Sequence, residues 1–168
     1  MPTGPAPQLT IRPASPADVP LVLGMVKELA QYERLAHEVV ATEEDYHAAL
    51  FGLRPAAEAA LAHWGDEPAG VAIYFTNFST FLGRPGLYLE DLFVRPAFRG
   101  RGVGGALLAH LAALVQQRRG GRVEWSVLDW NTPAIGFYQR IGAAPRSGWT
   151  TYRLDQPALA QLAHGAQG

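Results

Sequence analysis

The sequence contains no cysteine among its 168 residues. That absence excludes disulfide bonds, thiolate metal ligands and a cysteine nucleophile. Any acyl transfer by this chain would therefore proceed without a cysteine acyl-enzyme. The five histidines are scattered without the spacing of a metal site, so we expect no bound metal.

Long apolar runs are also missing. No apolar stretch approaches the roughly 20 residues that a membrane span needs. The proline-rich start over residues 1–8 lacks the pattern of an export signal, and we expect it to be a flexible tail. The sequence thus predicts a cytoplasmic protein without a membrane partner.

Charge of one sign is not in excess, because the net charge is only −1. A nucleic-acid partner is not expected without a strong basic stripe. The charge is nevertheless uneven: residues 1–84 hold ten acids and five bases, and residues 85–168 hold five acids and nine bases. The second half suits an anionic ligand and the first a cationic one, although an accidental split gives the same numbers.

What is present is the patterning of a single α/β domain over residues 9–156, followed by a tail or short helix at 157–168. Strands are predicted at 9–12, 57–63, 70–78, 87–94, 122–129 and 149–154, and helices at about 15–32, 42–52, 103–118 and 131–142. Short links favour antiparallel pairing among the early strands, and helical connections favour parallel pairing later. The expected fold is a mixed sheet flanked by helices.

A glycine-rich stretch between a predicted strand and a predicted helix indicates a phosphate site. It consists of Arg99, Gly100, Arg101, Gly102, Val103, Gly104 and Gly105. Glycines allow a phosphate to approach the unpaired N–H groups of a helix start, and the arginines add positive charge. A flexible glycine turn is the structural alternative. A dinucleotide domain is disfavoured, because residues 95–99 separate the strand from the glycines and too little chain follows.

The motif resembles the acetyl-CoA signature of the GCN5-related N-acetyltransferase (GNAT) superfamily. Further matches are Leu-Tyr-Leu-Glu-Asp at 87–91, Asp-Trp-Asn at 129–131 and Phe-Tyr-x-Arg-x-Gly-Ala at 137–143. From about residue 9 to 154, the chain is similar to the diamine acetyltransferases that act on spermidine, spermine or thialysine. The resemblance implies a GNAT-type sheet whose parallel pair is splayed at the acetyl-CoA site. It also implies a homodimer.

The implied activity is direct transfer of acetyl from acetyl-CoA to a primary amine of a small diamine, polyamine or diamino acid. Such a reaction needs a base for the amine proton and an acid for the leaving thiolate. We predict Tyr138 as the acid. Glu90 is the predicted base, acting through a water, because Glu90 and Asp91 interrupt an apolar strand. The alternative for Tyr138 is a tyrosine of the hydrophobic core, and the alternative for Glu90 and Asp91 is a pair of surface acids.

The resemblance also implies roles for further residues. The expected coenzyme contacts are the backbone of Leu92, Phe93 and Val94, the glycine stretch, and Asn131, Ala134, Phe137, Tyr138 and Arg140. The expected amine pocket contains Tyr32, Glu33, Glu90, Asp91, Asp129 and Trp130.

The stretch 77–86 departs from the polyamine enzymes because it contains no acid. This difference favours a short diamine, a diamino acid or a lysine analogue over a long polycation. Arg84 is a candidate partner for a substrate carboxylate, or a solvated turn residue. Two other functions remain open at this point: acetylation of an antibiotic amine or a protein N-terminus, and coenzyme A binding without catalysis.

Overall fold

The structure, a computed structural model, describes residues 8–165, which fall into two compact units divided between Ser126 and Val127. The first unit holds a five-stranded sheet in the order β1-β2-β3-β4-β5. The strands are β1 (Leu9–Pro13), β2 (Glu58–Trp64), β3 (Glu67–Ser79), β4 (Arg84–Val94) and β5 (Val123–Trp125). Pairing is antiparallel from β1 to β4 and parallel between β4 and β5, which confirms the predicted mixed sheet.

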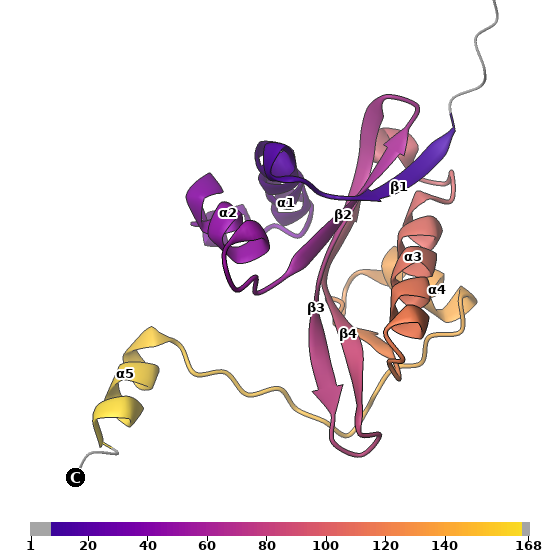
Figure 1. Ribbon diagram of the computed structural model, residues 1–168. Coiled ribbons are helices and arrows are strands. Elements are labelled where there is room, and N and C mark those ends of the chain that lie inside the picture. Colours follow the sequence, from indigo (N-terminus) through magenta and orange to yellow (C-terminus); the bar gives the residue numbers. More distant parts are fainter. Residues whose placement is uncertain (1–7, 166–168) are drawn as a thin grey trace, which may run out of the picture. The chain divides into compact units, whose positions relative to one another are not determined.

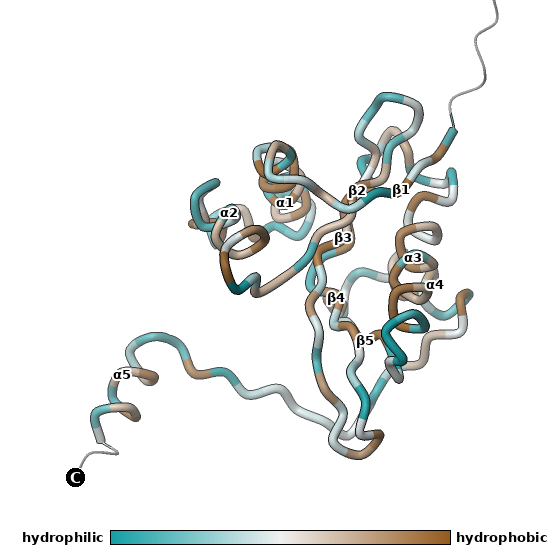
Figure 2. The backbone as a smooth tube through the Cα atoms, viewed as in Figure 1, coloured by the Kyte–Doolittle hydropathy of each residue, from teal (hydrophilic) through white to brown (hydrophobic). Residues whose placement is uncertain are grey.

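Helices cover both faces of this sheet. Figure 1 shows α1 (Val19–Tyr32) and α2 (Glu43–Phe51) on one side and α3 (Val103–Gln117) on the other. The core under α1 and α2 joins Met25 and Leu50 to Val71 and Phe93 of the sheet. Figure 2 shows the hydrophobic residues concentrated along the strands and the helices that cover them. Three short 3-10 turns complete the unit, at Pro16–Asp18, Ala36–Glu38 and Pro96–Phe98.

The predicted helix starts are confirmed, and local side chains explain them. The Thr42 hydroxyl accepts a hydrogen bond from the Asp45 N–H at 3.2 Å, and the Asp45 carboxylate accepts one from the Thr42 N–H at 2.8 Å. Such a capping box satisfies two N–H groups that the helix itself cannot. Asp18 accepts from the Ser15 N–H at 2.7 Å in the same way before α1.

A β-bulge in β4 shapes the edge of the sheet next to β5. Ile73 pairs with Asp91 and Tyr74 pairs with Leu89, so Glu90 is the extra residue of the bulge. The ladder to β5 covers only Leu87, Tyr88 and Leu89. Beyond them, from Glu90 to Val94, β4 has no strand on that side among residues 8–165. The splayed parallel pair is thus present, and β5 is shorter than the predicted strand at 122–129.

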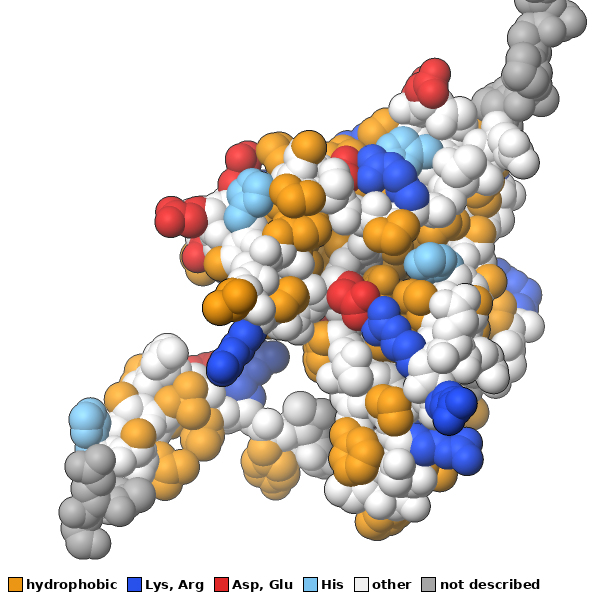
Figure 3. Space-filling view, in the orientation of Figure 1, with side chains coloured by type: hydrophobic (Ala, Val, Ile, Leu, Met, Phe, Trp, Pro, Cys, Tyr) orange, Lys and Arg blue, Asp and Glu red, His pale blue; other side chains and the backbone are white. Residues whose placement is uncertain are grey.

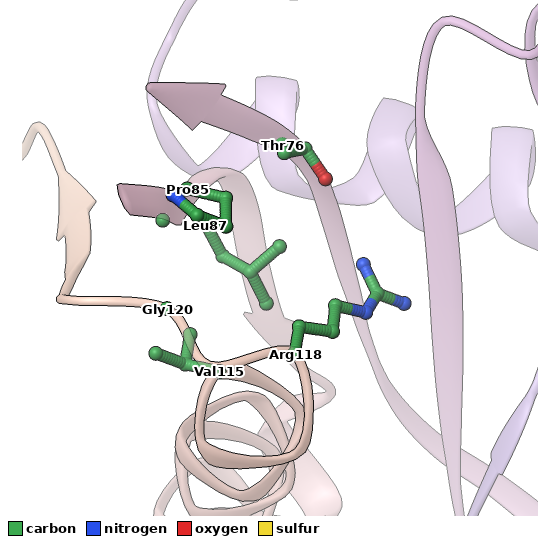
Figure 4. A pocket seen from close by; sticks show the side chains of 7 residues that line it. Thr76, Pro85, Leu87, Val115, Arg118 and Gly120 are labelled. Atoms are coloured by element: carbon green, nitrogen blue, oxygen red, sulfur yellow. The ribbon is translucent and has the colours of Figure 1, made fainter. Parts of the chain in front are cut away.

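The C-terminal end of α3 is a close-packed turn. Arg119 has φ 55°, and the Gly120 N–H donates to the Val115 carbonyl at 2.8 Å. A Cβ on Gly120 would lie 2.9 Å from the Pro85 carbonyl oxygen, so this position requires glycine. Figure 4 shows the small cavity beside it, about 10 Å³, which has room for about one water molecule and no larger ligand.

The second unit contains α4 (Thr132–Arg140) and α5 (Gln156–Gly165). The predicted strand at 149–154 is wrong. Within the described part of this unit there is no strand for it to pair with, and Trp149 and Tyr152 are 80% and 93% exposed. Strand propensity alone cannot form a ladder without a partner. No helix of the described residues is long and apolar enough to cross a membrane.

Candidate active site

The predicted phosphate loop follows β4 through the 3-10 turn at Pro96–Phe98. Gly100 and Gly102 have φ of 75° and 81°, the left-handed region that favours glycine. A Cβ at Gly100, Gly102 or Gly105 would meet no heavy atom within 4 Å, so the loop surface there is open. The N–H groups of residues 103–105 begin α3 and have no acceptor inside the helix. The loop has the geometry of an anion-binding helix start.

Aromatic rings hold the two arginines of this loop. The Arg99 guanidinium lies 5.0 Å from the ring centroid of Tyr32, and its Nε donates to the Val94 carbonyl at 3.0 Å. The Arg101 guanidinium lies 5.3 Å from the Trp64 ring centroid and 5.7 Å from that of Phe98. Both side chains therefore lie against aromatic rings at the start of α3.

The open side of β4 contains the residues expected to pair with the coenzyme arm. Leu92 and Val94 are half-buried and Phe93 is buried, so the strand is held in the core while its edge lacks a strand partner among the described residues. The Val94 carbonyl already accepts a hydrogen bond from Arg99. The open edge at Leu92 and Phe93 and the glycine loop together fit an extended ligand that ends in phosphates.

An acidic cluster lies beside the bulge of β4. Burial, followed by the charges of Glu90 and Glu33, raises the pKa of Asp91 to about 6. Glu33 is the C-cap residue of α1, and burial raises the pKa of its carboxyl group. The structure therefore brings together three of the predicted pocket residues. Within the cluster, Glu90 is the extra residue of the bulge and is exposed, whereas Asp91 is half-buried.

Tyr46 was not predicted and belongs to the same cluster. It lies in α2, packs against the core between α1 and the sheet, and is half-buried. Burial, together with the nearby charge of Asp91, raises the pKa of the Tyr46 phenol. Nothing in the local sequence marks this tyrosine, because its position beside Asp91 depends on how α2 packs.

Figure 3 shows acidic side chains gathered over α2, whose first turn contains Glu43, Glu44 and Asp45.

Arg84 does not fit the role of a partner for the carboxylate of a short amino acid. It begins β4, seven residues before Asp91. At about 3.3 Å per residue the two positions are roughly 23 Å apart, far more than the length of a diamino acid. Arg84 is exposed at the β3–β4 turn, as expected of a solvated residue.

The remaining predicted site residues belong to the second unit. The Asn131 side chain is buried and accepts a hydrogen bond from the Ala134 N–H at 3.4 Å, which caps α4. Tyr138 is half-buried, with its ring centroid 5.5 Å from that of Phe137. Arg140 ends α4 and is exposed, as are Asp129 and Trp130 before the helix. α4 thus places Tyr138 on a short, capped helix.

Comparisons with known proteins agree with this geometry. The profile of the Acetyltransferase (GNAT) family matches residues 26–143. An L-ornithine N5-acetyltransferase of Arabidopsis thaliana is 32% identical over 94% of this chain and 89% of its own length. A thialysine N-epsilon-acetyltransferase of Sus scrofa is 32% identical over 91% of this chain and 96% of its own.

Solved structures show the same fold. An integron cassette protein from V. cholerae has a TM-score of 0.77 and 27% identity, covering 95% of this chain and 99% of its own. An aminoglycoside acetyltransferase from a soil metagenome has a TM-score of 0.74 at 15% identity, covering 88% of this chain and 97% of its own. The second likeness concerns the fold alone.

Proposed function

Because this chain belongs to the GNAT acetyltransferase family and is an N-acetyltransferase, we propose that it transfers acetyl from acetyl-CoA to the side-chain amine of a small diamino acid or diamine. The relatives that acetylate ornithine and thialysine support this substrate class. The observation that carries the proposal is the acidic cluster of Asp91, Glu90 and Glu33 beside the open edge of β4.

The coenzyme would bind along two features of the first unit. The open edge at Leu92 and Phe93 offers backbone groups to the pantetheine amides, as an added strand would. The N–H groups at residues 103–105 and the positive end of α3 take the pyrophosphate. Arg99 and Arg101 add positive charge there, and Asn131, Ala134, Phe137 and Arg140 complete the proposed coenzyme contacts.

The amine would enter as an ammonium ion, because a free alkylamine has a pKa of about 10.4. Asp91 is largely ionised at pH 7.5, since its pKa is about 6, and with Glu33 it attracts the cation. Tyr46 contributes its phenol to the same pocket. Tyr32, Asp129 and Trp130 would line the amine site with two aromatic rings and one carboxylate.

The chemical step requires two proton transfers. Glu90, exposed at the bulge, receives the amine proton through a water, and the neutral nitrogen then attacks the thioester carbonyl. The carbon–sulfur bond breaks, and Tyr138 donates its phenolic proton to the departing thiolate. Acetyl would pass directly from coenzyme to amine in a ternary complex, and the absence of cysteine excludes a cysteine acyl-enzyme on the way.

An amine panel tests the proposed substrate class. Purified protein is mixed with acetyl-CoA and ornithine, thialysine, lysine, putrescine, spermidine or an aminoglycoside, and free thiol release is followed. We expect turnover with ornithine or thialysine above that with spermidine. Turnover only with the aminoglycoside, or none with any of these amines while acetyl-CoA still binds, would overturn the proposed substrate class.

The family resemblance also leads us to propose a homodimer.

A further inference from the structure

Six arginines of the first unit differ in what their guanidinium groups contact. Carboxylates pair with four of them: Arg12 with Asp18, Arg95 with Glu28, Arg118 with Glu58 and Arg122 with Glu124. Arg99 and Arg101 lie on aromatic rings instead. Across residues 8–165, no carboxylate forms a salt bridge with either of these two. Their charge is therefore not neutralised beside the glycine loop.

The two rings under Arg101 are themselves firmly held. Trp64 is the last residue of β2, and its backbone pairs with Leu9 of β1 and Glu67 of β3. Phe98 is only 9% exposed in the 3-10 turn before the loop. Arg101 lies between Gly100 and Gly102, whose left-handed conformations set the direction of the loop. The exposed Arg101 side chain thus lies against two rings whose own positions are set by the sheet and the core.

Ring stacking leaves an arginine able to bind an anion. A cation–π contact uses the flat face of the guanidinium, so the N–H groups around its edge can still donate hydrogen bonds to phosphate oxygens. A salt bridge to a carboxylate would instead occupy those N–H groups and cancel the charge. Holding the side chain in place beforehand also reduces the entropy lost when a ligand binds.

We propose that Trp64 is a positioning residue that holds Arg101 for the phosphates in the nucleotide half of the coenzyme. Trp64 then contributes to coenzyme affinity without touching the reacting atoms. The inference rests on the proposed acetyl-CoA site and adds a residue to which no role has been assigned.

Steady-state kinetics with acetyl-CoA test the proposal. For Trp64→Leu we expect the KM for acetyl-CoA to rise about three- to tenfold, with kcat within about twofold of the wild type. Trp64→Phe keeps a ring and should lie close to the wild type. Tyr152→Leu, which removes an exposed ring in the second unit, is the matched control and should change neither constant.

Two further measurements separate positioning from a general structural effect. The dissociation constants of coenzyme A, 3′-dephospho-coenzyme A and pantetheine are measured for each variant. Trp64→Leu should weaken the binding of coenzyme A and leave the binding of pantetheine unchanged. The affinity for the dephospho form shows which phosphate Arg101 contacts. In an Arg101→Gln background, Trp64→Leu should have no further effect.

The outcomes that overturn the proposal are distinct. An unchanged KM in Trp64→Leu, an equal loss of pantetheine affinity, or a full effect in the Arg101→Gln background would each contradict it. If Trp64→Leu unfolds, Trp64→Met, which also removes the ring, takes its place in the cycle with Arg101→Gln. A wild-type protein that does not use acetyl-CoA would contradict the proposed function instead.

Discussion

At the scale of single residues, Asp91 is the most informative side chain. Burial and two neighbouring acids raise its pKa to about 6, which means that the folded protein holds its negative charge at a cost. Perturbed carboxylates of this kind are concentrated at functional sites, where stability is given up for activity. Asp91 should therefore behave differently from the paired acids elsewhere in the chain.

Asp91→Asn should raise the free energy of unfolding and lower the enzymatic activity. The folded-state pKa is raised, so the contribution of Asp91 to stability is fully present below pH 3.8 and is lost as the pH rises toward 6. The neutral amide avoids that loss and should add about 1–2 kcal/mol to the free energy of unfolding at pH 7.5. Urea unfolding at pH 4 and pH 7.5 measures this. A variant that is less stable at pH 7.5 would contradict the prediction.

The pH profile of the wild-type enzyme should show the same group. As the pH falls through about 6, Asp91 takes up a proton and the pocket loses attraction for the ammonium, so kcat/KM for the amine should decline. This decline is the acidic limb of the pH profile, and we expect it although Glu33, Glu90 and Tyr46 are neighbours of Asp91. The acidic limb should be absent in Asp91→Asn. Persistence of the limb in the variant would assign it to another residue.

Tyr138→Phe should retain acetyl-CoA binding and lose turnover by about a hundredfold, because a general acid typically contributes 10²–10⁴ to the rate. Calorimetry measures the binding and thiol release measures the rate. Tyr152→Phe is the matched control, since the Tyr152 side chain is 93% exposed. Full activity in Tyr138→Phe would remove Tyr138 from the mechanism.

At the scale of elements, the bulge at Glu90 lies where two features of β4 meet. The ladder to β5 ends at Leu89, directly before the bulge, and the strand edge proposed for the coenzyme arm begins there. The bulge also lies within the acidic cluster: the exposed Glu90 is its extra residue, and the partly buried Asp91 follows it. One irregularity in one strand thus shapes both the proposed coenzyme site and the proposed amine site.

The end of α3 offers a test that is independent of activity. Arg119 has φ 55°, which costs about 1 kcal/mol for a residue with a Cβ. Arg119→Gly should therefore raise the free energy of unfolding by up to about 1 kcal/mol. Arg119→Ala keeps the Cβ and should give no gain, so the comparison isolates the backbone. Equal stability of the two variants in thermal unfolding would contradict this account.

At the scale of the whole molecule, the proposed homodimer predicts a mass of about twice the 18.2 kDa chain in solution. Light scattering coupled to gel filtration measures it directly. A single-chain mass across a range of protein concentrations would refute the dimer and leave the proposed activity untouched.

Local features were the ones that could be predicted from the sequence. Thr42 with Asp45 identified a helix start, and the glycine-rich stretch at 99–105 identified a loop before a helix, because a few neighbouring residues determine such features. Glu90 and Asp91 were predicted as site residues because they are acids inside an apolar strand. The predicted strand at 149–154 failed, since a strand forms only where another strand pairs with it.

The sequence by itself determined the order of the helices and strands as far as α4, the caps, the glycine loop and the family. Only the tertiary structure decided that Glu90 forms a bulge, that Asp91 is partly buried near Glu33 and Tyr46, and that Arg101 lies over the Trp64 ring. The physical reason is that caps and turns depend on adjacent residues, whereas burial, raised pKa values and ring stacking depend on which distant segments pack together.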